Sequence, residues 1–443
     1  MKLFTGQIFA GSASLRRRVL VNTGALASAN LWRIVVSFLV QLLVARGLGL
    51  EALGQYTVAM AYLNISQVLC EMGLPLWVVR ELAQAPHLRR AYFTRSVLVQ
   101  GAAALLLWLV LAGLATVLPY PPITRMAIFW VGASLPLFAV TSAAATIFQA
   151  GERLELAFTV ELITNLLILL FSAWLIGEQR TVADLLLVVV VAQGIGMVAA
   201  LGILFASRLL ATPQLPASLS WRQMAEGTLP FFGLSLTDVL LQRLDILLLS
   251  LFGDTRLLGV YSAAYNLVRV GIKLLQSLWR GVYPTLARLY PTSPARATHL
   301  ARTLLGVGLI LCVLAALMTD VLATPILRLI YGITDSAADG VANGSANGAA
   351  EKEAAIALAW LVWQAPLFFL ELYATTWLLV IGRAGIGFGV SLFHLLLLTL
   401  LLPVGAMLNG AVGAAWGTVA AQAFGAVVAL WLVQRLTNKL RNA

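Results

Sequence analysis

The sequence predicts an all-α membrane protein of twelve transmembrane helices, arranged as two parallel six-helix bundles around a central cavity. Hydrophobic residues make up 61% of the chain and charged residues only 11%, whereas about a quarter of the residues in a soluble protein are charged. Apolar runs of about 20 residues, the length that a helix needs to cross a bilayer, follow one another along the chain. A sequence pattern also recurs in the two halves, which indicates a duplicated bundle.

Twelve apolar runs account for most of the 443 residues. The first follows Arg16, Arg17 and Arg18 and continues to about residue 45, so it is longer than the core of a cleaved signal peptide, which has roughly 7 to 15 residues. The connecting loops are too short to fold as separate domains. We therefore expect membrane bundles at residues 1–210 and 211–443, with spans near 20–45, 52–75, 92–118, 123–148, 155–177, 182–206, 229–252, 258–282, 301–325, 355–381, 385–407 and 410–434.

Basic residues are distributed unequally between the two sides of this predicted domain. If the N-terminus is cytoplasmic, eighteen of the 29 Lys and Arg residues fall in cytoplasmic segments and six on the opposite side. Cytoplasmic loops of membrane proteins carry an excess of Lys and Arg, so both termini are expected in the cytoplasm. The same distribution explains the net charge of +11 without a nucleic-acid partner.

A glycine-containing pattern occurs at the junction of the first two spans and again at the junction of the seventh and eighth. Residues 44–56, VARGLGLEALGQY, are echoed by residues 249–261, LSLFGDTRLLGVY. A repeat of six spans returns the chain to its starting side, so the two halves are expected to share one orientation, related by an axis along the membrane normal. Two such bundles leave a cavity between them, which is the arrangement that alternating access requires.

Residues 20–290 resemble the polysaccharide and O-antigen flippases, which belong to the superfamily of the multidrug and toxin extruders and the lipid II flippase. The first half of the pattern is carried by Ala45-Arg46, Leu48-Gly49, Gly54-Gln-Tyr56, Gly73-Leu-Pro75 and Arg80. The second half is carried by Arg243-Leu-Asp245, Phe252-Gly253 and Gly259-Val-Tyr261-Ser-Ala-Ala264.

The resemblance implies a flippase that moves a polyprenyl-diphosphate-linked oligosaccharide across the plasma (cell inner) membrane by alternating access. Its expected partners are the bilayer, the lipid-linked anionic glycan, H⁺ or Na⁺ as a coupling ion, and other glycan-assembly membrane proteins. No cofactor is implied.

Five cations fall inside predicted spans. A cation at the centre of a spanning helix costs about 3 kcal/mol, so such residues usually face a bundle interior or a hydrated cavity. At 100° per residue, Tyr265, Asn266, Arg269, Lys273, Gln276 and Arg280 lie on one face of the eighth span, and Asn30 and Arg33 share a face of the first. Arg243 points about 140° away from Asp238 on the seventh span, which favours contact with a neighbouring helix over a place in the same cavity.

We hypothesise that the cations Arg33, Arg269, Lys273 and Arg280 bind the diphosphate or acidic sugars of the glycan, since a phosphate needs several charge-assisted donors. The polar residues Asn30, Tyr265, Asn266 and Gln276 would line the same cavity. The alternatives are that Arg280 reaches the membrane surface and that Arg269 and Lys273 pair with acids on neighbouring helices.

Acidic side chains inside the spans are candidates for ion coupling, with structural ion pairing as the alternative for each. These acids are Glu71, Glu161, Asp238, Asp245 and Glu371. His394 also lies in an apolar span, where a hydrogen-bonded packing role is expected rather than a metal-binding or proton-relay role.

No catalytic residue or metal site is expected. The sequence lacks a phosphate-binding Gly-x4-Gly-Lys-[Ser/Thr] loop, and its three histidines and two cysteines do not have metal-ligand spacing. A cation-coupled multidrug exporter is one alternative, although cationic drugs favour acidic or aromatic cavity walls. A membrane-embedded glycan polymerase or glycosyltransferase is the other, but such enzymes usually have a large ordered loop, whereas the longest outer loop, 334–350, consists mainly of small residues.

Overall fold

The computed structural model describes residues 5–211, 220–252, 255–331 and 344–442. Every regular element in these ranges is helical, so the all-α prediction is confirmed for the described part of the chain. The helices form two compact units. Unit 1 consists of Met1–Val40 and Ile65–Leu236, and unit 2 consists of Gln41–Asn64 and Thr237–Ala443.

Two helices are divided between the units. Residues 41–64, in the middle of α1 (Thr5–Glu71), group with unit 2, and α7 (Trp221–Phe252) begins in unit 1 and ends in unit 2. The predicted boundary between residues 210 and 211 assigns residues 41–64 to the first bundle, whereas in the structure they group with unit 2. The expected pair of six-helix bundles stays a prediction, and each compact unit is described by itself.

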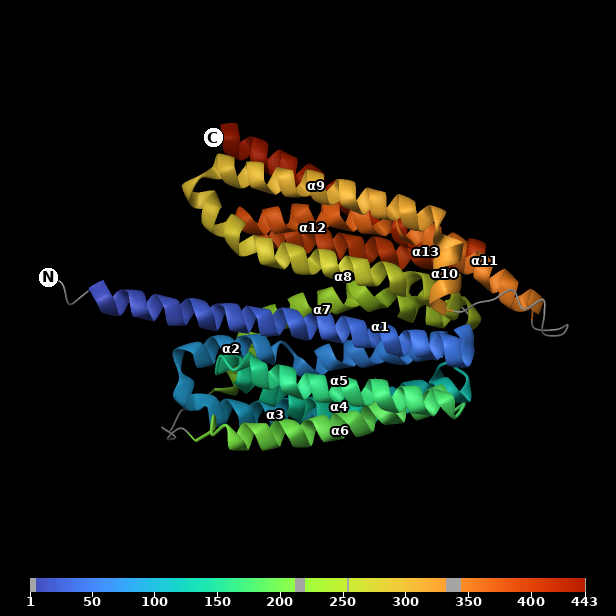
Figure 1. The fold of residues 1–443 in the computed structure, drawn as a ribbon, viewed down its shortest axis with the longest axis horizontal. Helices are drawn as coiled ribbons and strands as arrows, with labels where there is room; N and C mark the ends of the chain where they lie inside the picture. The colour runs from blue at the N-terminus through green and yellow to red at the C-terminus, as the bar shows by residue number, and fades with distance from the viewer. Residues whose placement is uncertain (1–4, 212–219, 253–254, 332–343, 443) are drawn as a thin grey trace. The chain divides into compact units, whose positions relative to one another are not determined.

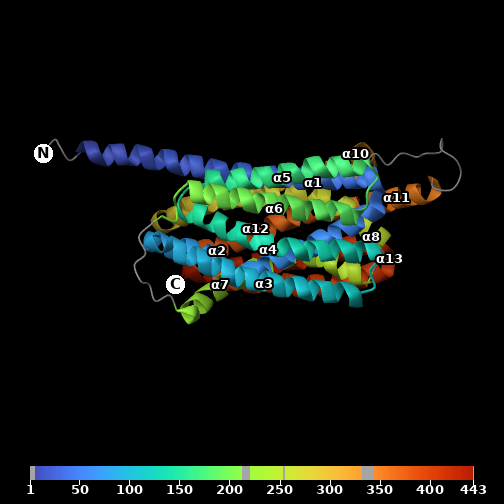
Figure 2. The same cartoon turned by 90° about the horizontal axis from the view of Figure 1, so that it is seen from below.

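Unit 1 is built around α4, which packs against α2, α3, α5 and α6, and the helices α3 to α6 run side by side (Figures 1 and 2). Thr181 begins α6 with a reciprocal capping box, in which the Asp184 carboxylate accepts from the Thr181 backbone N–H and the Thr181 hydroxyl accepts from that of Asp184. The other helices of this unit are α2 (Leu74–Gln84), the short η1 (Pro86–Leu88), α3 (Arg89–Val117), α4 (Pro122–Ala150), α5 (Leu154–Gly177) and α6 (Val182–Ala206).

Unit 2 has its aromatic core where α8 meets α12. The Trp279 ring lies 5.6 Å from Phe369 and 5.8 Å from Tyr373, measured between ring centroids. The helix α12 packs against α8, α9 and α13, and α8 also packs against α9 and α13 (Figure 1). The helices of this unit are α8 (Thr255–Thr292), α9 (Pro294–Val321), α10 (Ala323–Tyr331), α11 (Gly344–Leu361), α12 (Gln364–Val380) and α13 (Ala384–Asn442).

The two longest helices are each interrupted once. In α1, Gly49 has φ 89° and ψ 176°, and in α13 the break falls at Asn409 and Gly410, where Gly410 has φ 54°. Glycine adopts positive φ without the steric penalty that a Cβ brings. The breaks lie between the expected spans 20–45 and 52–75 and between 385–407 and 410–434.

Eight stretches of the described residues are long and apolar enough to cross a membrane. Two of these, Leu31–Gln84 with 54 residues and Gly385–Leu436 with 52, exceed twice the roughly 20 residues of one crossing and contain the breaks described above. The helices α7 and α8, with 32 and 38 residues, also exceed one crossing length. The count of twelve spans, the parallel bundles and the central cavity stay predictions.

Large apolar side chains are exposed along several of these helices. Leu109 and Val117 on α3, Trp174 on α5 and Val198 on α6 are each more than half exposed. Extended apolar surface of this kind is not tolerated in water on a monomeric soluble protein, whereas lipid chains cover it at no cost. The exposure therefore agrees with a membrane-spanning fold.

The expected loop at residues 334–350 is shorter than predicted. The helix α11 begins at Gly344, and its sequence after Gly348, AAEKEAAIALAWL, consists mainly of strong helix formers. Residues 334–343 lie outside the described residues.

The two copies of the glycine pattern pack directly against each other within unit 2. A Cβ placed on Gly54 would lie 2.3 Å from the Thr255 carbonyl oxygen, and one placed on Gly259 would lie 1.9 Å from the Leu50 carbonyl oxygen. The Thr255 hydroxyl also donates to the Glu51 carboxylate at 3.0 Å. Small residues allow helix backbones to approach closely in membranes, so these two glycines are explained by the crossing of 50–54 with 255–259.

Candidate functional site

A buried cluster of charged and aromatic side chains lies in unit 2 between α7 and α8. Arg243 and Asp245 come from α7, and Tyr265 and Arg269 come from α8. Arg243 interacts electrostatically with Arg269, Asp245, Tyr265 and Tyr56, and Arg269 interacts with Asp245 and Tyr265. The side chains of Arg243, Asp245 and Arg269 are all buried, so their charged groups have little contact with solvent.

The Asp245 carboxylate is held by hydrogen bonds from several directions. Its Oδ1 accepts from the Ile246 backbone N–H at 2.8 Å, and its Oδ2 accepts from the Tyr261 hydroxyl at 3.3 Å. Tyr261 lies 3.1 Å from the Thr418 hydroxyl of α13 and stacks on Tyr265 at 5.5 Å between centroids. These bonds fix one carboxylate beside two guanidinium groups, so the three side chains carry one excess positive charge.

Two residues of this region have polar atoms without a hydrogen-bond partner in the described part of the chain. They are Asn266, of which both side-chain amide atoms are unpaired, and Arg269, of which Nη1 is unpaired. Asn266 is 3% exposed and Arg269 is 8% exposed. Leaving such a buried group unsatisfied costs about 1–3 kcal/mol, so these atoms are candidates for ligand contacts.

The structure thus brings together three of the residues predicted for the cavity, Tyr265, Asn266 and Arg269. Lys273 and Gln276 lie half-buried further along α8, and Lys273 makes contacts of its own. The side chains of Asn30 and Arg280 lie outside the described residues.

Arg243 was predicted to contact a neighbouring helix, and it interacts with Tyr265 and Arg269 of α8. Its helical angle relative to Asp238 gives only the direction of the Cα–Cβ bond, so whether Arg243 also faces the cavity stays a prediction.

In unit 1, Arg33 lies among acids. Its Nε is 3.7 Å from Oε1 of Glu161 on α5, and its side chain is 59% exposed. Arg33 also interacts electrostatically with Glu71, whose carboxylate accepts from the Ser142 hydroxyl of α4 at 2.6 Å. Ion pairing is the structural alternative that we gave for Glu71 and Glu161, and the roles of Arg33 in cargo binding and of the two acids in ion coupling stay predictions.

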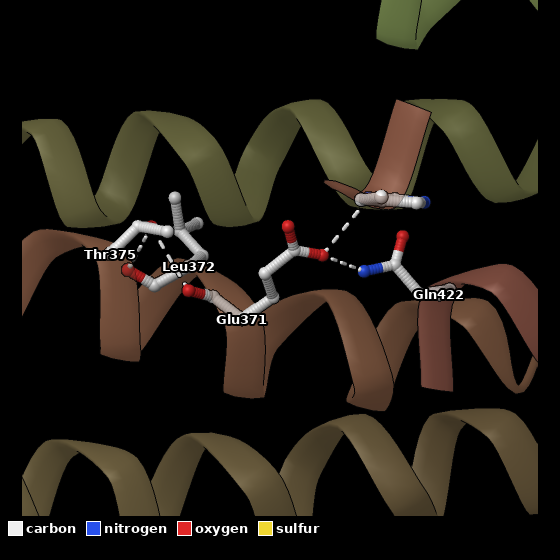
Figure 3. Close-up of polar contacts among 5 residues, drawn as sticks. Glu371, Leu372, Thr375 and Gln422 are labelled. Carbon is white, nitrogen blue, oxygen red and sulfur yellow. Dashed lines mark hydrogen bonds and ion pairs between the residues drawn. The ribbon is translucent and has the colours of Figure 1, made fainter. Parts of the chain in front are cut away.

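The remaining two acids differ sharply in their surroundings. Asp238 is exposed and accepts from Gln242, one turn along the same helix, at 2.9 Å. Glu371 is buried on α12, and Figure 3 shows its carboxylate directed toward the Gln422 amide, which donates to Oε2. Nδ1 of His394 lies 3.2 Å from the same oxygen.

The contact between Glu371 and His394 joins two buried ionisable groups, 6% and 7% exposed. It depends on a close approach at Gly425, where an added Cβ would lie 3.3 Å from the His394 ring and 3.4 Å from Oε2 of Glu371. The sequence did not indicate this pair, because its members lie on different helices and no motif links them.

No group of three or more His, Cys, Asp or Glu side chains that could hold a metal ion occurs among the residues that the structure describes. A groove of about 370 Å³ lies at the turn between α5 and α6, lined mainly by Phe171, Trp174, Leu187 and Val191 with charged residues at its rim. None of the candidate site residues lines this groove.

The fold is shared with solved membrane transporters. The chain is similar to an inward-facing multidrug resistance MATE family transporter of the MOP superfamily, with a TM-score of 0.75 at 12% identity over 92% of this chain and 95% of that one. It is also similar to the lipid II flippase MurJ in an inward closed conformation, with a TM-score of 0.69 at 13% identity over 94% and 87%. The Vibrio cholerae MATE transporter VcmN gives a TM-score of 0.62 at 17% identity over 97% and 98%.

At these identities the structural likeness establishes the fold alone, which confirms the prediction of a polytopic helical membrane protein. The family is established by sequence, since the model of the polysaccharide biosynthesis proteins matches residues 19–290. The chain belongs to this family, so the resemblance drawn from the motifs is confirmed. Comparison with curated protein sequences finds no match.

Proposed function

We propose that the protein is a flippase that carries a lipid-linked oligosaccharide, attached to a polyprenyl diphosphate, across the plasma membrane by alternating access. Its family, polysaccharide biosynthesis, supports a glycan cargo. MurJ, to which it is similar in fold, is named as a flippase of lipid II. Both termini would lie in the cytoplasm, as the distribution of basic residues indicates.

One observation carries the proposal, namely that Arg243 and Arg269 share a single buried carboxylate. A buried cation that lacks a full counter-charge is costly in a membrane protein, and a diphosphate would supply the missing negative charge. Guanidinium groups bind phosphate oxygens through paired, charge-assisted hydrogen bonds. The unpaired Nη1 of Arg269 and the unpaired amide of Asn266 would be the first contacts of such a group.

Export of cationic drugs is the second candidate function, and it is favoured by unit 1. There Glu71 and Glu161 lie around one partly exposed arginine, Arg33, which leaves an excess negative charge among these three side chains. A MATE family transporter is also among the proteins of similar fold. The two functions therefore predict opposite charges on the cargo.

The test is flipping of a fluorescent undecaprenyl-diphosphate oligosaccharide in proteoliposomes. We expect Arg269→Ala to reduce the initial rate about 10- to 100-fold, because hydrogen bonds to charged groups contribute about 1.5–3 kcal/mol. Arg222→Ala is the matched control, since Arg222 lies on α7 in an exposed pair with Glu226, and it should retain the wild-type rate.

Binding assays distinguish lost function from lost fold. Native mass spectrometry with geranylgeranyl diphosphate should show retention by the wild type and loss in Arg269→Ala, while geranylgeraniol should not be retained by either. Arg269→Lys, which keeps the charge, should recover part of the binding. Full flipping by Arg269→Ala, or export of ethidium without any glycan transport, would exclude the flippase proposal.

A further inference from the structure

Glu371 and His394 form a buried ionisable pair that cargo binding does not use. We propose that this pair is a proton-binding site, and that H⁺ rather than Na⁺ is the ion coupled to transport. The coupling part of this proposal rests on the proposed transport function, whereas the proton-binding part does not.

The geometry places the two groups within ion-pair distance. Nδ1 of His394 lies 3.2 Å from Oε2 of Glu371. A neutral imidazole has one donor nitrogen and one acceptor nitrogen, so the ring can take up a proton beside the carboxylate. With the proton bound, imidazolium and carboxylate neutralise each other. Without it, a single negative charge remains in a buried region of a membrane protein.

The donors around Glu371 argue against Na⁺ at this place. Oε2 already accepts a hydrogen bond from the Gln422 amide and lies 3.2 Å from Nδ1 of His394, so two nitrogen atoms occupy the space around the oxygen that a metal ion would need. A hard cation requires several oxygen ligands. In the described ranges, the side chains offer no cluster of three or more His, Cys, Asp or Glu that could hold a metal.

Charged groups on the helices that pack against α12 and α13 have contacts elsewhere. On α8, Arg269 interacts with Asp245 and Lys273 makes contacts of its own. On α9, Arg302 lies near Tyr373 of α12. On α11, Glu353 accepts from the Ala411 backbone N–H of α13. The contacts given for these groups are with residues other than Glu371 and His394.

The Glu371 side chain also links α12 to the two segments of α13 that lie on either side of its break. His394 precedes the break of α13 at Asn409 and Gly410, and Gln422 follows it. Glu371 of α12 contacts both residues through one oxygen atom. A change in the charge of the pair would alter the bonds that hold these three segments together, which gives proton binding a route to a conformational change.

The first test measures proton binding without any cargo. In ¹⁵N-histidine-labelled protein with His87→Gln and His299→Gln, only His394 contributes a ring signal. We expect the ring signal to change from the neutral to the protonated form of His394 as the pH is lowered, and we expect Glu371→Gln to alter this change because it removes the partner carboxylate. Replacing K⁺ by Na⁺ should change nothing. A ring that stays in one form throughout, or a change that is the same in Glu371→Gln, would overturn the proton-binding site.

The second test measures coupling in proteoliposomes that carry the lipid-linked oligosaccharide. An imposed pH gradient should accelerate flipping by the wild type several-fold, and this response should be lost in Glu371→Gln and in His394→Gln. Glu226→Gln is the matched control, because the Glu226 side chain is 64% exposed in a pair with Arg222 and should leave the response intact. Acceleration by a Na⁺ gradient and not by a pH gradient would overturn the coupling. If no glycan moves in any sample, the flippase proposal fails while the titration still decides the proton site.

Discussion

The contact between the two glycine patterns can be tested with the substitution Gly259→Ala. The added Cβ would lie 1.9 Å from the carbonyl oxygen and 2.6 Å from the carbonyl carbon of Leu50. Both are backbone atoms, so no side chain can rotate away to make room. The methyl group must instead push residues 50–54 and 255–259 apart.

The size of the effect follows from overpacking, which costs about 1–3 kcal/mol when one methyl group is forced into a filled space. Gly271→Ala is the control, because Gly271 lies on the same helix α8 with nothing within 4 Å of an added Cβ. There the substitution should be neutral or stabilising by up to about 1 kcal/mol, since alanine favours helix formation over glycine. Each variant adds one methyl group to the wild type, so a difference between them reflects only the surroundings of that group.

The assay is thermal unfolding of the purified protein in detergent, followed by light scattering and tryptophan fluorescence. We expect the apparent Tm of Gly259→Ala to fall by several degrees relative to wild type, at about 2–4 °C per kcal/mol for a unit of 150–250 residues. Gly271→Ala should melt at or above the wild-type temperature. Equal melting temperatures for the two variants would refute the direct backbone contact.

Four further outcomes are expected. Gly227→Ala should lower the Tm and alter tryptophan emission, because its Cβ would lie 2.2 Å from Nε1 of Trp77. Ser142→Ala should destabilise by about 1–3 kcal/mol, since it removes the donor to the half-buried Glu71 carboxylate. Arg46→Ala should accelerate hydrogen exchange at the end of α10, whose last carbonyls accept from its guanidinium. Cysteines introduced near the termini, at positions 12 and 442 in a cysteine-free background, should react with impermeant maleimide only from the cytoplasmic side.

The helix boundaries were largely predictable, because the thickness of the bilayer fixes the length of an apolar run. The expected spans at 155–177 and 182–206 agree within a residue with α5 and α6. The expected span at 355–381 is divided into α11 and α12, and the signal for this break was Pro366. Proline removes a donor and clashes with the carbonyl of the residue four positions earlier, here Val362, which lies at the break.

The candidate site was only partly predictable. Arg269 and Asn266 could be found because a single helix carries both, and helical periodicity places them on one face. The neighbours of Arg269 on α7, and the contact of Arg243 with Tyr56 of α1, depend on which helices pack together. The sequence of one chain does not contain this information. The same holds for His394 and Glu371, whose approach also requires the absence of a side chain at Gly425.

The assignment of residues 41–64 to unit 2 has a consequence for how the protein is made. Roughly 200 residues separate Gly54 from Gly259, and a ribosome that adds 5–20 residues per second needs about 10–40 s to produce them. Throughout this interval the first glycine pattern has been synthesised, but the α8 segment that packs against it has not. A fragment that ends at residue 210 would keep this surface uncovered, and a fragment that starts at 211 would lack its partner. Co-expression of the two fragments should restore the contact between the two glycine patterns, which neither fragment can form alone.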